Sequence, residues 1–259
     1  MRLHWDRMTS PEVARALADS PGAVGLVPVG ATEQHGPHLP LGTDTFVAEG
    51  IAALAAERAG AAVLPAITVA CSYGHGTAFP GTLAVAPELL AATVRELAWW
   101  CAASGLRRLV LVNGHFGNRA ALAVATDHLR LRRTDLQVGV FEWWAAAPDV
   151  AEVVTEDGED VHANRAETAL MLALAPDLVR TDLLAQADDP DRTGGLVFRY
   201  TAGALSTNGV TGSPSRATRE LGEWLLGRVV DELAERVRRA RSERPPLRGP
   251  APATAPGRP

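Results

Sequence analysis

The chain has little cysteine, no long apolar run and no excess of positive charge. Its two cysteines, Cys71 and Cys101, are too few for a disulfide framework, so we expect a reducing compartment. No apolar stretch reaches about 18 residues, and residues 1–6 lack the apolar core of a secretory signal. We therefore predict a cytoplasmic protein with no membrane partner.

Charge and composition narrow the class further. The 25 Lys and Arg residues are outnumbered by 30 Asp and Glu residues, which gives a formal net charge of −5. A nucleic-acid binder usually presents a basic face, so we expect no nucleic-acid partner. At 259 residues and 47% hydrophobic content, the chain is long enough for one large domain with a substantial core.

Several common catalytic motifs are also missing. The sequence has no Gly-x-Ser-x-Gly elbow, no Walker-type phosphate loop and no His-Glu-x-x-His pair. It also lacks a Rossmann fingerprint after the first predicted strand. Any catalytic site must therefore be built from other residues.

Short β-rich runs alternate with Ala- and Leu-rich segments of helical period. This alternation predicts an α/β fold, a single-domain three-layer α/β/α architecture with a mostly parallel sheet. The predicted strands are 23–29, 61–67, 106–112 and 136–141, and the predicted helices are 45–59, 87–104, 118–132, 167–175 and 215–241.

The remaining segments suggest how the domain is bounded. Residues 143–161 and 185–212 are predicted to be long connections, which are usually functional or mobile. We expect the domain to cover residues 1–241. Residues 242–259 are rich in Pro, Arg, Ala and Gly without periodicity, which predicts a disordered tail.

Ligand-type side chains cluster directly after the first predicted strand. Glu33, His35 and Asp44 lie within residues 30–44, which follow the apolar run 23–29. Open α/β sheets place their chemistry at the C-terminal ends of strands. Mixed carboxylate and imidazole ligands suit Zn, Mn or Fe. The segment therefore favours a metal site over a polar loop with ordinary surface acids.

Two further clusters are expected at the same edge of the sheet. His115 follows the third predicted strand, where a lone histidine would more often be a packed loop residue. His162 and Glu167 open a later helix. We expect Glu167 near a metal rather than solvated at the helix start. We expect His162 in the substrate pocket as proton donor or acceptor, because its unperturbed pKa of about 6.5 suits that role.

Aromatic and polar side chains elsewhere are candidates to line a substrate pocket. Tyr73, His75 and Phe79 lie in a glycine- and proline-rich loop after the second strand, although His75 fits a surface histidine equally well. Trp143 and Trp144 would close over a flat heterocycle, or else be buried under the loop, which is the commoner fate of tryptophan.

Together these residues predict metal-assisted hydrolysis. Glu33, His35, His115 and Glu167 could hold two cations around a bridging Asp44. Such a centre lowers the pKa of a bound water and polarises a carbonyl, as amide hydrolysis requires. His162 could then protonate the leaving nitrogen. We expect two divalent metal ions as cofactors and a small-molecule amide as substrate.

These same residues resemble the creatininase family of metal-dependent amidohydrolases over about residues 8–237. The most specific pieces are residues 27–44, 79–82, 113–118, 162–168 and 208–214. The resemblance implies that Glu33, Asp44 and His115 bind one metal, that His35 and Asp44 bind a second, and that His162 serves in proton transfer. It also implies Zn, Mn or Fe, a homo-oligomer that is often a hexamer, and hydrolysis of C–N bonds in cyclic amides, lactams or formamides.

Two positions depart from the family pattern. Family members that act on creatinine carry a Glu that binds the second metal at the position of Gly117. In this chain Glu167 or a solvent molecule must therefore complete the coordination of the second metal. Arg165 replaces an acid, which either favours an anionic substrate or reflects a solvent-facing arginine. Two alternatives to the small-amide hydrolase stay open. One is the family branch that trims a redox-cofactor precursor peptide, and the other is a non-catalytic scaffold.

Overall fold

Four parallel strands form the centre of the computed structural model, which describes residues 4–247. The strands are β1 (Gly25–Val29), β2 (Ala62–Val63), β3 (Arg108–Asn113) and β4 (Gln137–Glu142), in the spatial order β2-β1-β3-β4. All three strand pairs are parallel. These pairings confirm the predicted parallel sheet. Helices connect successive strands, because parallel strands need a long crossover connection.

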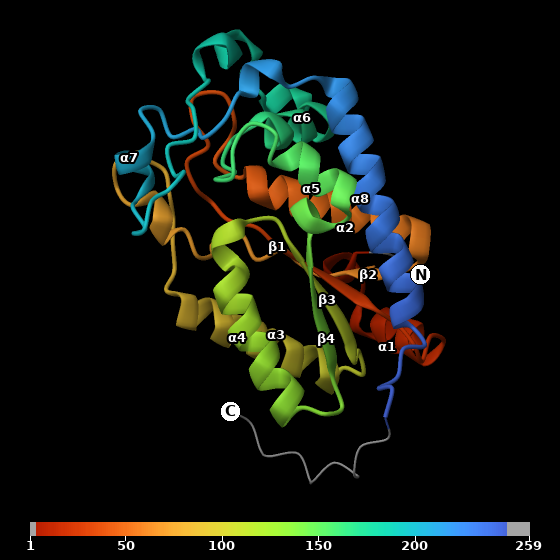
Figure 1. Cartoon of the computed structure of the whole chain (residues 1–259). Helices are drawn as coiled ribbons and strands as arrows, with labels where there is room; N and C mark the ends of the chain where they lie inside the picture. Colours follow the sequence, from red (N-terminus) through yellow and green to blue (C-terminus); the bar gives the residue numbers. More distant parts are fainter. Residues whose placement is uncertain (1–3, 248–259) are drawn as a thin grey trace.

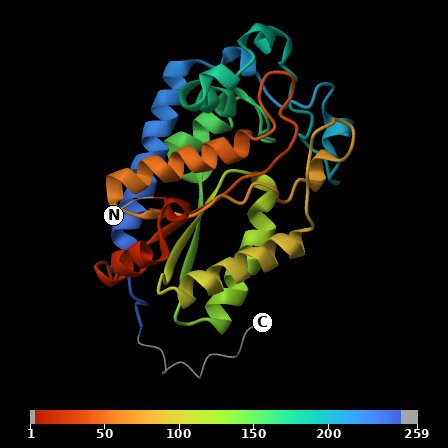
Figure 2. The same cartoon turned by 180° about the vertical axis from the view of Figure 1, so that it is seen from behind.

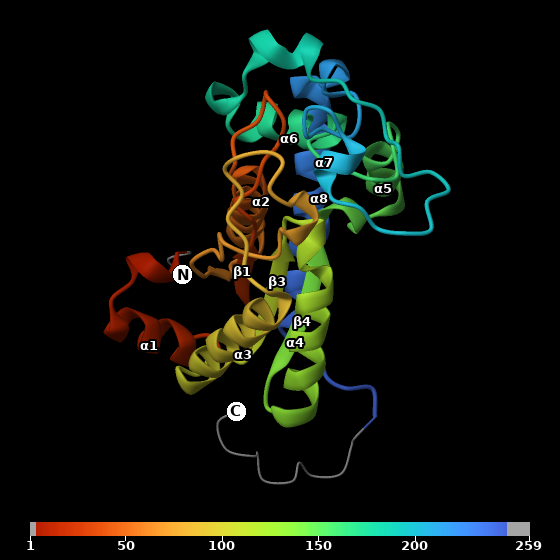
Figure 3. The same ribbon diagram turned by 90° about the vertical axis from the view of Figure 1, so that its left-hand side faces the viewer.

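Helices cover both faces of this sheet (Figures 1 and 2). One layer contains α2 (Thr43–Ala59), α6 (Arg165–Leu174) and α8 (Arg219–Ala240). The opposite layer contains α3 (Pro87–Ala103) and α4 (Arg119–Arg132). The shorter helices are α1 (Ser10–Ala18), α5 (Pro148–Val154) and α7 (Ala202–Leu205). Figure 3 shows the segments around α6 and α7 gathered at the end of the molecule away from α1.

Alternate side chains of the central strands enter two separate cores. In β1, Leu26 packs in the cluster on the α2, α6 and α8 side, whereas Val27 and Val29 pack in the cluster on the α3 and α4 side. In β3, Val112 and Leu111 divide in the same way. Because both faces are covered, β1 is apolar throughout and β3 is apolar from Leu109 to Val112, rather than alternating with polar residues.

Two segments differ from their predicted structure. The strand predicted over 61–67 is hydrogen-bonded as a strand only over Ala62–Val63, because Pro65 has no N–H to offer the sheet. The segment 143–161 is not one long connection. It contains a short 3-10 helix, Trp143–Ala145, followed by α5, whose first residue is Pro148.

The chain connections diverge at the C-terminal ends of β1 and β3. The chain leaves β1 for α2 on one face, and later reaches β3 from α3 on the other face. In open α/β sheets a ligand binds where the connections diverge in this way, beyond the C-terminal ends of the strands. Glu33 and His115 follow these two strands.

The C-terminal segment is described only in part. Residues 242–247 contain no helix or strand, and the rest of the predicted tail, 248–259, lies outside the described residues. Within residues 4–247, no helix is long and apolar enough to cross a membrane.

The contact between α6 and α8 gives a stability prediction. A methyl group on Gly222 of α8 would overlap the carbonyl of Ala169 in α6, whereas nothing lies within 4 Å of one on Gly227. We expect Gly222→Ala to lower the free energy of unfolding by about 1–3 kcal/mol through overpacking. Gly227→Ala should raise it by about 0.5–1 kcal/mol, because alanine favours the helix. Chemical denaturation of both variants measures this; equal shifts would contradict the close helix contact.

Candidate metal centre

Five ligand-type side chains from separate segments meet beyond the ends of β1 and β3. Glu33 and His35 lie on the loop after β1, and Asp44 lies in the first turn of α2. His115 follows β3, and Glu167 lies in the first turn of α6. All five are buried, with at most 7% of their surface exposed.

The first ligand group consists of Glu33, Asp44 and His115. Nδ1 of His115 lies 3.2 Å from Oε1 of Glu33 and 3.3 Å from Oδ2 of Asp44. Nε2 of the same ring donates to the carbonyl oxygen of Cys71 at 2.8 Å. This donation leaves Nδ1 as the free nitrogen facing the two carboxylates, which is how metal-binding histidines are usually oriented.

The second ligand group consists of His35, Asp44 and Glu167. Nε2 of His35 lies 3.2 Å from Oδ1 of Asp44, and its Nδ1 donates to the carbonyl oxygen of Glu33 at 3.2 Å. The two carboxylate oxygens of Asp44 therefore face two different imidazoles. Asp44 belongs to both groups.

The Asn118 side chain and the glycine at position 114 hold the segments around the cluster close together. The Asn118 side chain donates to the carbonyl of Gly30 at 2.9 Å and accepts from the N–H of Cys71 at 3.1 Å, which ties three loops together. A side chain at Gly114 would overlap the carbonyl of Asp44. Glycine at this position therefore lets the start of α2 approach the end of β3.

The buried polar atoms lack protein partners. Both carboxylate oxygens of Glu33, Nε2 of His35 and Oδ2 of Asp44 are inaccessible and have no hydrogen bond of acceptable geometry. Burying charged or polar atoms without compensation is costly. Carboxylate and imidazole donors turned toward a shared space fit a divalent cation of the Zn, Mn or Fe type.

The charges of the cluster shift the pKa values of its members. Burial lowers the pKa of His35 and of His115, but the surrounding carboxylates outweigh it and raise the values to about 10 and about 9. Burial raises the pKa of Glu33, but His115 and His75 bring it well below its usual value. Burial raises the pKa of Glu167 to about 7, with His35 opposing. Protons on the two imidazoles balance the carboxylates, and a bound metal would replace them.

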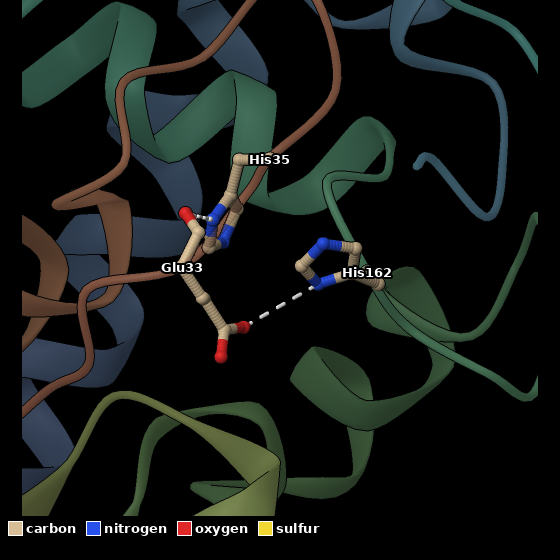
Figure 4. Close-up of side chains that lie close together, drawn as sticks. All are labelled: Glu33, His35 and His162. Carbon is tan, nitrogen blue, oxygen red and sulfur yellow. Dashed lines mark hydrogen bonds and ion pairs between the residues drawn. The ribbon is translucent and has the colours of Figure 1, made fainter. Parts of the chain in front are cut away.

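His162 lies on the open side of this cluster. Its Nδ1 is 3.7 Å from Oε1 of Glu33. Figure 4 marks this pair with a dashed line. Burial, followed by the nearby His35 and His75, brings the pKa of His162 well below its usual value. His75 itself lies against Glu33, with Nε2 2.9 Å from Oε1. Glu33, His35 and His162 also form a third close group of ligand-type atoms.

A cavity of about 310 Å³ opens beside these residues. Among the predicted site residues it is lined by His75, His115, His162 and Glu167. It is also lined by Asp160, Arg199 and Tyr200, which sequence reasoning missed. Their only signal was that they belong to the two segments predicted as long connections, which often carry function.

Five of the six predicted substrate contacts, all except His75, lie outside the cavity lining. Trp143 is fully buried in the core and Trp144 stacks on Phe116, with ring centroids 3.9 Å apart, so neither forms a lid over the cavity. Arg165 pairs with Glu156, away from the cavity. Phe79 also lies outside the cavity lining.

Tyr73 and Gly117 complete the comparison of predicted and observed positions. Tyr73 is 61% exposed and does not line the cavity, although the adjacent Gly74 does. A side chain at Gly117 would overlap Nε2 of His115 and the carbonyl of Cys71. Position 117 therefore has no space for a ligand side chain in this conformation. Glu167 supplies the third side chain of the second group instead.

A parallel α/β sheet with carboxylates and imidazoles grouped at its C-terminal edge is the architecture of a metal-dependent hydrolase. The family model described as "Creatininase: Creatinine amidohydrolase" matches residues 6–237. The chain belongs to the creatininase family, whose hydrolases act on C–N bonds.

The relatives carry two different names. The chain is 35% identical over 235 residues to the mycofactocin precursor peptide peptidase of Mycolicibacterium smegmatis, covering 85% of this chain and 86% of the relative. It is also 35% identical over 231 residues to the creatinine amidohydrolase of Pseudomonas putida, covering 82% of this chain and 88% of the relative.

Solved structures agree with the fold. A crystal structure of creatinine amidohydrolase superimposes with a TM-score of 0.82 at 31% identity, covering 93% of this chain and 99% of the other. Similar creatininase structures are described as a Mn form, with a TM-score of 0.79, and as a Zn-Zn form, with a TM-score of 0.80. The expected family, α/β fold and hydrolase class are confirmed.

The burial of Trp143 gives a second prediction. We expect Trp143→Ala to lower the free energy of unfolding by about 3–5 kcal/mol, because it removes a large side chain from a filled core. Leu131→Ala serves as the control, since Leu131 is 77% exposed, and should cost about 1 kcal/mol or less. Thermal and denaturant unfolding measure both. A Trp143→Ala variant as stable as the unmodified protein would contradict the core placement.

Proposed function

We propose that the protein is a dinuclear metal-dependent amidohydrolase. One divalent cation would be held by Glu33, Asp44 and His115, and a second by His35, Asp44 and Glu167. The observation that carries this proposal is the position of Asp44, whose two oxygens face the imidazoles of the two groups. Zn, Mn and Fe all suit these mixed nitrogen and oxygen donors.

The bound cations would supply Lewis acidity and a water molecule of lowered pKa, which amide hydrolysis requires. The protein's own groups prepare the reaction. Glu33 and Asp44 place negative charge in a water-poor setting, and the Cys71 carbonyl orients His115. The cavity beside them has the volume of a small-ligand pocket, so a substrate amide can reach the cluster.

His162 is proposed to move the proton. Its lowered pKa keeps the ring neutral near pH 7, and its Nδ1 faces Glu33 and the cavity. A neutral imidazole in this position can act first as a general base, accepting a proton from the attacking water. It can then act as a general acid and pass that proton to the leaving nitrogen.

The proposed substrate is a small cyclic amide, lactam or formamide. The cavity accommodates a compound of this size, and Asp160 and Arg199 offer one group of each charge at its wall. The absence of a side chain at Gly117 separates the site from the pattern associated with creatinine itself. Creatinine is therefore not the first choice.

A second candidate function is trimming of a precursor peptide. The segment Leu196 to Tyr200 carries apolar side chains beside the cavity, and Val197 and Phe198 are 87% and 72% exposed. Arg199 and Tyr200 of this segment line the cavity itself. An exposed apolar rim suits a substrate that extends beyond the cavity, as a peptide does.

We also propose that the protein forms a homo-oligomer, with a hexamer as the arrangement to test. Large apolar side chains lie exposed outside the cavity, among them Leu83, Leu89 and Trp100. Contiguous exposed apolar surface is typical of subunit contacts. Analytical ultracentrifugation of the purified chain measures the assembly.

Substitution of the shared carboxylate tests the metal centre. We expect Asp44→Ala to lose most of its bound transition metal and to reduce turnover by at least about a hundredfold, because both cations lose a ligand. Asp127→Ala, on the exposed surface of α4, is the matched control. Elemental analysis and circular dichroism accompany the assay. Full metal content in folded Asp44→Ala protein would refute the bridging role.

Substitution of Arg199 separates the two substrate classes. The Mn- or Zn-loaded protein is screened against cyclic amides, formamides and peptides with a free C-terminal carboxylate. If peptides are the substrates, Arg199→Ala should raise KM about tenfold or more, because a charge-assisted contact is lost. Arg130→Ala on α4 controls for the change in net charge. Turnover of neutral lactams with no effect of Arg199→Ala would instead support the small-amide function.

A further inference from the structure

The Gln34 side chain turns away from the carboxylates and enters a network between two histidines. The residue is 4% exposed. Its amide nitrogen lies 3.1 Å from Nδ1 of His75, 2.9 Å from Nε2 of His162 and 2.9 Å from the carbonyl oxygen of Gly209. An amide nitrogen carries two hydrogens, so these three neighbours cannot all accept from it.

The orientation of the amide group is fixed by its surroundings. Its oxygen accepts from the N–H of Gly36 at 3.0 Å. A flipped amide would turn two donors toward each other at Gly36 and two acceptors toward each other at Gly209. Gly209 has a φ of +87°, and a side chain there would overlap the Gln34 amide, so glycine allows this loop to close over it.

The hydrogens of the two imidazoles follow from counting donors. The backbone carbonyl of Gln34 lies 2.8 Å from Nε2 of His162, and a carbonyl can only accept, so Nε2 carries a hydrogen. The two amide hydrogens of Gln34 then go to Gly209 and to Nδ1 of His75. His75 consequently carries its hydrogen on Nε2, which lies 2.9 Å from Oε1 of Glu33.

The opposite assignment leaves polar atoms without partners. If Nε2 of His162 accepted from the amide, the backbone carbonyl of Gln34 would lose its donor. Nδ1 of His75 would lose its donor as well, because the other amide hydrogen is committed to Gly209. Buried polar groups are rarely left unpaired, since an unpaired group loses its hydrogen bonds to water without replacement. The first assignment pairs both amide hydrogens and the backbone carbonyl of Gln34, and it gives Nδ1 of His75 a donor.

We propose that Gln34 is a positioning residue that sets the tautomers of His75 and His162. Its carbonyl holds the hydrogen of His162 on Nε2, which leaves Nδ1 free on the side of Glu33 and the cavity. Its amide directs the hydrogen of His75 toward the Glu33 carboxylate. The consequence for catalysis rests on the proposed proton transfer by His162, whereas the tautomers themselves do not.

Nitrogen NMR tests the tautomers directly. The full-length protein is labelled with ¹⁵N-histidine and loaded with zinc, and long-range proton–nitrogen correlations identify the protonated ring nitrogen of each neutral histidine. His75→Gln and His162→Gln assign the two signals. The test variant is Gln34→Glu, which keeps the shape of the side chain but replaces both amide hydrogens with an acceptor. Gln137→Glu, on the edge strand β4, is the matched control.

The expected result is an Nε2–H tautomer for both histidines in the unmodified protein and in Gln137→Glu. In Gln34→Glu the hydrogen of His75 should move to Nδ1, facing the new carboxylate. With a substrate found by the screen, the kcat of Gln34→Glu should fall about ten- to a hundredfold, while its KM should stay within about twofold of the unmodified value. A fall of this size is part of the rate enhancement that a positioned proton-transfer group contributes.

Two outcomes would overturn the inference. One is an Nδ1–H tautomer of His75 in the unmodified protein, and this measurement does not depend on how any variant folds. The other is a Gln34→Glu spectrum in which His75 keeps the tautomer of the unmodified protein. Because the NMR readout needs no substrate, a failure of the proposed amidohydrolase function leaves it interpretable.

Discussion

The concentration of buried negative charge at one end of the sheet is the constraint on which the site depends. Glu33, Asp44 and Glu167 are each at most 3% exposed and lie within reach of one another. Such a cluster is stable only with positive charge among the carboxylates, because the desolvation of an uncompensated carboxylate is costly. Protons on His35 and His115 offer that charge in the metal-free chain, and divalent cations offer it more strongly. Binding of a metal at the proposed centre would therefore be coupled to folding through the same few side chains.

The fold builds this cluster from residues that are distant in sequence but end at the same edge of the sheet. Because β1 and β3 are parallel neighbours, the residues that follow them converge, and α2 and α6 begin where those strands end. This is why the sequence could predict that the candidate ligands lie close together. Carboxylates or imidazoles occur just beyond two apolar strands and at two helix starts. Predicting that they meet requires only this local pattern and the rule that strand ends carry chemistry.

The pocket walls were predicted poorly for an equally physical reason. Trp143 and Trp144 lie directly after a strand, like the ligands, but their apolar surface packs inward, and sequence alone does not show which way a loop aromatic turns. Arg199 and Tyr200 reach the cavity from a segment outside every motif. Their placement depends on how residues 185–212 fold back over the sheet, and no periodic pattern encodes such a path.

The division between ligands and walls explains how one centre can serve different substrates. The candidate metal ligands come from strand ends and helix starts, which packing of the cores fixes in place. Asp160, Arg199 and Tyr200 come from connections that change more freely without loss of the core. Relatives equally similar to this chain are named for a peptidase and for a creatinine amidohydrolase. Equal identity to the two relatives is expected if the shared residues mainly build the sheet and the ligand cluster. The residues that select the substrate should then lie in the connections.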